Sequence, residues 1–363
     1  MRLARPLVVL ALVACHRAGG LPGGLDVRTE PHAPDWEASI PLRPLPEAPL
    51  GVEADWKKVG VTPEKVRLGR WLFFDARLSA DGTISCASCH RPEHAFSEPT
   101  AVSTGIRGQQ GTRKAPPIVN AAWPVYPAFF WDGRARSLAE QAKGPIENPV
   151  EMGNTHAGAV RTIAAIAGYR RAFREAFGDE RVDIDRIADA IAAYEATRLS
   201  GGSAWDRYEA GDESALSPLA RQGRDLFFGE ARCNACHLGP NLSDARMHNI
   251  GIGYEWRPGL EPRDAFADRG RAGVTKAERD LGAFKTPGLR DVSKHAPYMH
   301  DGSIATLEEV VFYYVTGGNR NPWMAPEMDE IRLMGFQVRA VVAFLRALDG
   351  EGEAESAPAA FPR

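Results

Sequence analysis

The chain of 363 residues lacks several features that would assign it to other classes of protein. It has no run of about 18 apolar residues, which argues against a protein with several membrane-spanning helices. Its formal charge of −3 lacks the basic excess of a nucleic-acid binder. Its 5 cysteines are too few for a disulfide scaffold of this size. What is present, 44% hydrophobic and 25% charged residues, predicts a globular protein of about two domains.

The N-terminus is typical of an export signal. Two arginines precede a short apolar stretch, residues 7–13, that is too short to span a bilayer. The run Leu-Val-Ala-Cys at 12–15 resembles a bacterial lipobox, in which Cys15 is lipidated and becomes the mature N-terminus. The alternative is an ordinary signal peptide that is removed together with Cys15. We expect a lipoprotein-type signal at 1–15, and an exported, periplasmic protein that meets the membrane only through this lipid anchor.

The next segment and the C-terminal end have compositions of their own. Residues 16–55 contain seven prolines and little apolar periodicity, which predicts an extended tether. Residues 351–363 are acidic and rich in alanine and proline, which predicts a disordered tail.

Between these ends, apolar residues recur at helical spacing. The expected helices are 62–74, opened by Thr62 and a proline, 155–177, 184–194, a helix opened by Thr306, and 338–348. No segment alternates apolar and polar residues long enough to predict a sheet. The predicted fold class is all-α with long loops.

One hexapeptide repeats within the chain. The sequence Gly-Arg-Trp-Leu-Phe-Phe at 69–74 returns as Gly-Arg-Asp-Leu-Phe-Phe at 223–228. Each copy precedes a Cys-x-x-Cys-His motif, and the repeat predicts two tandem cytochrome c-like domains, 56–210 and 211–350.

The two Cys-x-x-Cys-His motifs predict covalently bound c-type haems. The residues are Cys86, Cys89 and His90 in the first motif, and Cys233, Cys236 and His237 in the second. Two thiols at this spacing can reach the two vinyl groups of one haem, and the adjacent histidine then faces the iron as its proximal ligand. Zinc is the first alternative, but paired zinc motifs are usually separated by ~15–20 residues, whereas 143 residues separate these two. Thiol redox chemistry is the second, but the βαβ pattern expected around it is absent.

The first haem is predicted to have an open coordination position. His94 is too close to the first motif to cross easily to the other face, and no further histidine or methionine follows before Gln141. The second half offers several candidate ligands, among which spacing alone does not choose. They are Met247, His248, His295, Met299, His300, Tyr313 and Tyr314.

At this point the sequence resembles the bacterial dihaem cytochrome c peroxidases and their MauG relatives. The resemblance runs from Trp56 to Leu348 and rests on short motifs in family order. They lie at 78–82, 130–135, 141–145, 148–152, 285–290 and 297–302. The resemblance implies that hydrogen peroxide reacts at the N-terminal haem and that the C-terminal haem passes electrons to it.

The resemblance also assigns roles to three residues. Gln141 and Glu151 fall where the family keeps polar groups over the peroxidatic iron, and a carboxylate with an amide can move and orient the proton that O–O cleavage requires. Trp131 matches the tryptophan that relays electrons between the haems. Without the resemblance, Glu151 reads equally well as a surface charge, and Trp131 as part of the core.

Three departures from the peroxidase pattern stand out. Ile106 occupies the place of a histidine that blocks the resting iron in many relatives, so the site should be open at rest. Tyr314, fourteen residues after His300, replaces a methionine ligand as in MauG, and a phenolate favours higher oxidation states of iron than a thioether does. Lys114 replaces the asparagine that binds calcium in the family, and an ammonium there would repel the ion or replace it, which leaves calcium in doubt.

The sequence therefore predicts a haem peroxidase that reduces hydrogen peroxide. Its electrons come from a small periplasmic redox protein (a cytochrome c or a cupredoxin), or from residues of a partner protein as in MauG. The alternatives are a non-catalytic dihaem electron carrier and a haem-based sensor.

Overall fold

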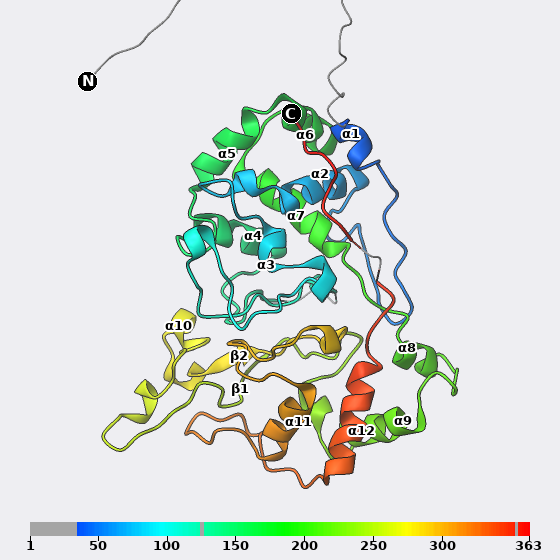
Figure 1. Cartoon of the computed structure of the whole chain (residues 1–363), viewed down its shortest axis with the longest axis vertical. Coiled ribbons are helices and arrows are strands. Elements are labelled where there is room, and N and C mark those ends of the chain that lie inside the picture. The colour runs from blue at the N-terminus through cyan, green and yellow to red at the C-terminus, as the bar shows by residue number, and fades with distance from the viewer. Residues whose placement is uncertain (1–34, 124–126, 353–354) are drawn as a thin grey trace, which may run out of the picture.

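The computed structural model describes residues 35–123, 127–352 and 355–363. The predicted signal, Cys15 and the first part of the predicted tether lie outside these residues. Two mostly helical domains stack one above the other (Figure 1). This agrees with the expected fold class, with one addition. Strands β1 (Met247–Asn249) and β2 (Ala283–Lys285) form an antiparallel pair, each too short for its alternation to be read from sequence.

The α-helices of the upper domain are α1 (Trp36–Ser39), α2 (Pro63–Phe74), α3 (Cys86–Cys89), α4 (Leu138–Glu147), α5 (His156–Ala164), α6 (Ala167–Phe177) and α7 (Ile184–Ala196). The α-helices after α7 in the chain are α8 (Ala204–Glu209), α9 (Pro218–Phe228), α10 (Ala272–Thr275), α11 (Leu307–Val315) and α12 (Gly335–Arg346). Short 3-10 turns lie at Ala76–Leu78, Pro92–His94, Ile106–Gly108, Cys233–Ala235, Pro262–Asp264, Glu278–Asp280 and Val292–Lys294. The helix expected over 155–177 is two helices, because the backbone at Ile166 is extended.

The repeated hexapeptide marks the same helix crossing in both domains. A Cβ atom on Gly69 of α2 would lie 1.8 Å from the carbonyl oxygen of Ala190 in α7. A Cβ atom on Gly223 of α9 would lie 1.8 Å from the carbonyl oxygen of Ala340 in α12. Only glycine lets each pair of helices approach this closely, which explains why both copies of the hexapeptide begin with it.

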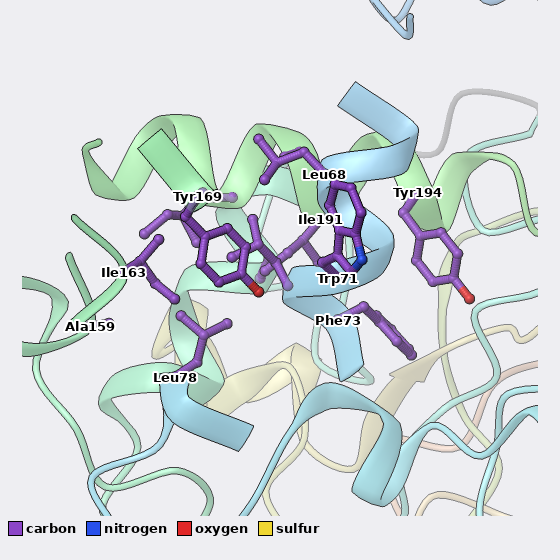
Figure 2. Close-up of a cluster of buried hydrophobic side chains, with 14 of the residues drawn as sticks. Leu68, Trp71, Phe73, Leu78, Ala159, Ile163, Tyr169, Ile191 and Tyr194 are labelled. Atoms are coloured by element: carbon purple, nitrogen blue, oxygen red, sulfur yellow. The ribbon is translucent and has the colours of Figure 1, made fainter. Parts of the chain in front are cut away.

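The core of the upper domain is built around the α2–α7 crossing. Figure 2 shows Trp71 and Phe73 of α2 beside Tyr194 of α7, with Tyr169 of α6 on the other side. Each of these four side chains is 0% exposed, and burial of one large apolar side chain stabilises a fold by about 1.5–3 kcal/mol. The Tyr169 hydroxyl donates a hydrogen bond of 2.6 Å to the Asp75 carboxylate, so its polar end is satisfied inside the core.

The predicted disordered tail is an ordered strap over the residues described. From α12 the chain runs back to the upper domain, where it ends beside α6 (Figure 1). Gly168 donates its backbone N–H to the carbonyl of Arg363, at 2.6 Å. Ser39 donates its hydroxyl to the carbonyl of Ala360, at 2.8 Å, and Phe361 packs on the core. The prediction of disorder was wrong because it used only the composition of the tail, which says nothing of partners that are distant in sequence.

The described part of the predicted tether also packs against the body. Ile40 is buried in the core of the upper domain, and Arg290 of the lower domain donates to the Gly51 carbonyl at 2.8 Å. Its proline-rich composition therefore fits an extended segment that lies along the surface. Among the residues described, no helix combines the length and the apolar character needed to cross a membrane.

Candidate active site

The first Cys-x-x-Cys-His motif faces a cavity of about 450 Å³ in the upper domain. Cys86 and Cys89 come from α3, and His90 follows its last residue. Burial raises the pKa of the Cys89 thiol to about 11, so the thiol is neutral at pH 7. The His90 Nδ1 lies 3.2 Å from the carbonyl of Phe96, which fixes the ring and makes Nε2 the nitrogen that would bind iron. Burial lowers the pKa of His90, which favours the neutral form that ligates metals.

The second motif repeats this arrangement around a largely apolar cavity of about 200 Å³ in the lower domain. The His237 Nδ1 lies 2.9 Å from the carbonyl of Leu242. Burial raises the pKa of the Cys233 and Cys236 thiols to about 12 in each case. Neutral thiols beside an apolar cavity, with an oriented neutral histidine, fit the covalent attachment of a haem.

The zinc interpretation does not fit this geometry. The two pairs of cysteines line different cavities, so they cannot form one four-thiolate site. Cys236, Asp244 and His248 have ligand atoms within 4.8 Å of one another, the one such group among the residues described. A thioether bond to haem would use the Cys236 sulfur and leave the pair of His248 and Asp244, whose atoms lie 2.8 Å apart.

The polar residues predicted over the first haem line the cavity of the first motif. Gln141 lies on α4, and Glu151 lies in the turn that follows it. The Asn148 amide donates a hydrogen bond of 2.7 Å to the Glu151 carboxylate. Burial raises the pKa of Glu151, while the positive charge of Arg134 opposes the rise. The structure thus brings a carboxyl of raised pKa and an amide together with the first Cys-x-x-Cys-His motif at one cavity.

Trp131 lines both haem cavities. Its indole N–H donates to the carbonyl of Lys114 at 2.8 Å, and its own carbonyl accepts from the Lys285 N–H at 2.7 Å. Its ring centroid lies 6.5 Å from that of His300 in the lower domain. The residue is therefore held from both sides, its indole by Lys114 of the upper domain and its backbone by Lys285 of the lower domain.

Four of the candidate ligands of the second haem line its cavity: His248, Met299, His300 and Tyr314. Met247, His295 and Tyr313 are not part of the wall of this cavity. His300 stacks on Phe284, with ring centroids 3.6 Å apart, and His248 is paired with Asp244. Tyr314 of α11 is partly buried, and this burial raises the pKa of its hydroxyl well above the ordinary value.

Lys114 lies at the boundary between the domains. Its ammonium donates to the carbonyl oxygens of Glu98 and Thr100, and its backbone N–H donates to the carbonyl of His300 at 2.7 Å. Burial lowers the pKa of Lys114 to about 8, although the Glu98 charge opposes the fall. The neighbouring Arg113 reaches a carboxylate in each domain, Asp132 and Asp268, both at 2.6 Å.

Sequence reasoning missed one acidic residue of the first cavity. Glu195 of α7 is 3% exposed, and burial raises its pKa to about 8. One of its carboxyl oxygens has no hydrogen-bond partner among the residues described. A signal was present, because Glu195 stands four residues after Ile191 on the apolar face of the helix, where a carboxyl is out of place.

The sequence missed a basic residue as well. Lys285 of β2 lines the second cavity, and burial lowers its pKa to about 8. No periodic signal marks it, because its burial depends on the contact between the two domains.

Comparisons with known proteins agree with this geometry. The family model for di-haem cytochrome c peroxidases matches residues 63–214. The chain is 39% identical over 299 residues to the methylamine utilization protein MauG of Methylorubrum extorquens, covering 82% of each chain. It is 40% identical over 294 residues to the cytochrome c551 peroxidase of Nitrosomonas europaea, covering 80% of this chain and 82% of that one. The crystal structure of a MauG-like protein associated with microbial copper homeostasis superimposes with a TM-score of 0.72 at 32% identity, covering 88% of this chain and 96% of the other.

These relatives cover most of the chain, including both haem motifs, and they confirm the expected activity class of a haem peroxidase-like enzyme. The chain belongs to the family of di-haem cytochrome c peroxidases and MauG proteins.

Proposed function

We propose that the protein carries two covalent c-type haems and reduces hydrogen peroxide at the one bound by His90. The observation that supports this most directly is that Glu151 and Gln141 line the same cavity as Cys86, Cys89 and His90. The two haems, when bound, supply the redox chemistry. The overall reaction consumes two electrons and two protons for each H2O2 and yields two molecules of water.

The residues around the first cavity handle the protons. As a carboxylate, Glu151 accepts the proton of the near oxygen of the peroxide and delivers it to the far oxygen, and its raised pKa suits that task. Asn148 fixes the carboxylate through one oxygen, which leaves the other for the substrate. Gln141 orients the peroxide from the adjacent wall.

We propose that this site is open at rest. Ile106 is 2% exposed and donates its backbone N–H to the Glu151 carbonyl at 2.7 Å. An aliphatic side chain at this position cannot ligate iron. The loop that holds Ile106 instead supports the backbone of Glu151.

The second haem is ligated in this proposal by His237 and Tyr314, and Trp131 relays electrons between the two sites. Two electron sources remain candidates: a small periplasmic cytochrome c or cupredoxin, or the residues of a partner protein. The name MauG for one relative supports the second, and the name cytochrome c551 peroxidase for another supports the first.

We further propose that the protein works without calcium at the domain boundary. The Lys114 ammonium is itself a cation bound by carbonyl oxygens, and a calcium ion beside it would be repelled. We also propose that residues 1–15 are a signal and that Cys15 is lipidated, so that the enzyme lies in the periplasm on a lipid anchor.

The test is to titrate the purified ferric protein with stoichiometric H2O2, without pre-reduction, and to follow it by optical and EPR spectroscopy. Loss of a resting high-spin signal at one equivalent supports an open first site and a tyrosine-ligated second haem. A ferric protein that is inert until half reduced would instead indicate a cytochrome c peroxidase with another ligand at the second iron. Two low-spin haems without any reaction would indicate an electron carrier, and ligand binding without turnover a sensor.

A further inference from the structure

The turn that carries Trp131 also carries an arginine that the proposed chemistry does not yet use. The Phe129 backbone N–H donates to the Ala135 carbonyl at 2.8 Å, which closes the turn. Phe130 adopts a positive φ of 62°, so the chain reverses sharply at this point. The reversal places Trp131 in the walls of both haem cavities and Arg134 in the wall of the first.

The Arg134 side chain is held in a defined place on this wall. Its Nη1 donates to both oxygens of the Asp132 carboxylate, at 3.1 and 3.0 Å. The guanidinium carbon lies 3.4 Å from the centroid of the Phe130 ring. An ion pair and a cation–π contact thus act on one guanidinium, and they fix its position although the side chain is 41% exposed.

The charge of Arg134 acts on the carboxyl that handles the proton. Arg134 and Glu151 line the same cavity, that of the first Cys-x-x-Cys-His motif. Burial raises the pKa of Glu151, and the negative charge of Glu98 adds to the rise. The positive charge of Arg134 and the hydrogen bond from the Asn148 amide act in the opposite direction.

The other cations of this wall have partners of their own. Arg113 pairs with Asp132 and Asp268, both at 2.6 Å, and the Lys114 ammonium donates to two backbone carbonyls. The titratable groups of the wall besides Arg134 and Glu151 are Cys86, Cys89, His90, Arg113, Lys114, Asp132 and Glu195. Arg134 is therefore the cation best placed to act on Glu151.

We propose that Arg134 is a positioning residue for the peroxide reaction, and that its guanidinium holds the Glu151 carboxyl in the ionised form. The inference rests on the proposed role of Glu151 as the group that accepts the proton of the peroxide. Only a carboxylate can accept that proton, and a guanidinium nearby stabilises a carboxylate relative to the neutral acid. One turn then serves both halves of the reaction, with Trp131 on the path of the electrons and Arg134 on that of the proton.

The experiment is an infrared pH titration of the full-length, haem-loaded ferric protein. The carbonyl stretching band of the protonated Glu151 carboxyl is identified by its absence in Glu151→Gln, and its decline with pH reports ionisation directly. In Arg134→Gln the midpoint should move upward by about one pH unit, which is the lower end of the usual effect of a nearby opposite charge. Arg134→Lys keeps the charge and should restore most of the wild-type midpoint. High salt should reduce the difference, because the guanidinium is partly exposed.

The matched control is Arg136→Gln, which removes the same charge from an exposed side chain outside the lining of the cavity. It should leave the midpoint unchanged. Equal midpoints in the wild type and Arg134→Gln would overturn the proposal, and so would an equal shift in Arg136→Gln.

Peroxide turnover of the same variants separates this inference from the proposed function. In an active enzyme, the acid limb of kcat/KM should move with the infrared midpoint in Arg134→Gln. A midpoint that moves as expected in a protein without peroxide turnover would support the role of Arg134 and contradict the proposed function instead.

Discussion

The substitution Glu151→Gln tests proton handling at the first haem site most directly. Glutamine has the size of glutamate and can still accept the hydrogen bond from Asn148, which is 2.7 Å long in the native protein. The residue is partly buried, and the exchange keeps its size while it removes the ability to carry a proton and the negative charge near Arg134. A loss of activity together with loss of the corresponding limb of the pH profile can then be assigned to this carboxyl.

The expected loss follows from the usual contribution of a positioned acid or base. Such a group accelerates a reaction by about 10²–10⁴-fold, so peroxide turnover should fall by at least ~10²-fold. That corresponds to about 2.7 kcal/mol of transition-state stabilisation. Because burial raises the pKa of Glu151, its carboxylate form becomes populated at a higher pH than that of an ordinary glutamate. The wild-type pH profile should therefore have an acid limb at this raised pKa, and the limb should be absent in Glu151→Gln.

The assay is stopped-flow consumption of H2O2, with kcat/KM measured across the pH range. Glu147→Gln is the matched control, because this carboxylate is at the end of α4, just before the turn that holds Glu151, but is 52% exposed. It should retain wild-type turnover. A rate for Glu151→Gln within twofold of the wild type, with the acid limb preserved, would refute the assignment of Glu151 as the proton-handling group.

Four further predictions follow from the structure. Trp131→Phe keeps an aromatic side chain but loses the indole and its hydrogen bond to Lys114; single-turnover kinetics should show electron transfer between the haems slowed by about tenfold or more, while the resting spectra stay unchanged. Tyr314→Phe should change the EPR signal of the second haem and leave that of the first; identical spectra would exclude Tyr314 as a ligand. Glu195 holds its proton up to about pH 8 in the folded state but loses it near its ordinary pKa when unfolded, so stability should fall by about 1.4 kcal/mol per unit as pH rises between these values. Denaturant titrations at pH 5 and pH 8 should show this slope in the wild type and not in Glu195→Gln. Because Lys114 occupies the domain boundary, EDTA should leave the activity unchanged, and a loss restored by calcium would contradict that prediction.

Features set by neighbours in sequence could be predicted closely. Helix α2 begins where Thr62 and a proline predict it, with the Thr62 hydroxyl accepting from the Lys65 N–H. Helix α11 begins after Thr306, whose side chain forms a capping box with Glu309. The haem motifs belong to the same class, because the spacing of two cysteines and a histidine is a local property.

Features set by distant contacts could not be predicted in this way. The order of the strap could not be predicted, because it follows the lower domain in sequence while its carbonyl groups accept from donors such as Gly168 of the upper domain. Lys114 could be recognised as an unusual residue, but its carbonyl partners at Glu98 and Thr100 follow only from the fold of the loop. Glu195 could be placed on an apolar helix face, yet the cavity that it lines is formed by several separate segments.

The strap has a consequence for the order in which the chain can mature. The backbone N–H at the start of α6 donates to the carbonyl of Arg363, which follows the lower domain in the chain. Chains are made from the N-terminus at about 5–20 residues per second, and domains often fold as they emerge. Here the contacts between the upper domain and the strap can form only after the lower domain has been synthesised. Final packing of the upper domain is thereby linked to synthesis of the segment that follows the lower one.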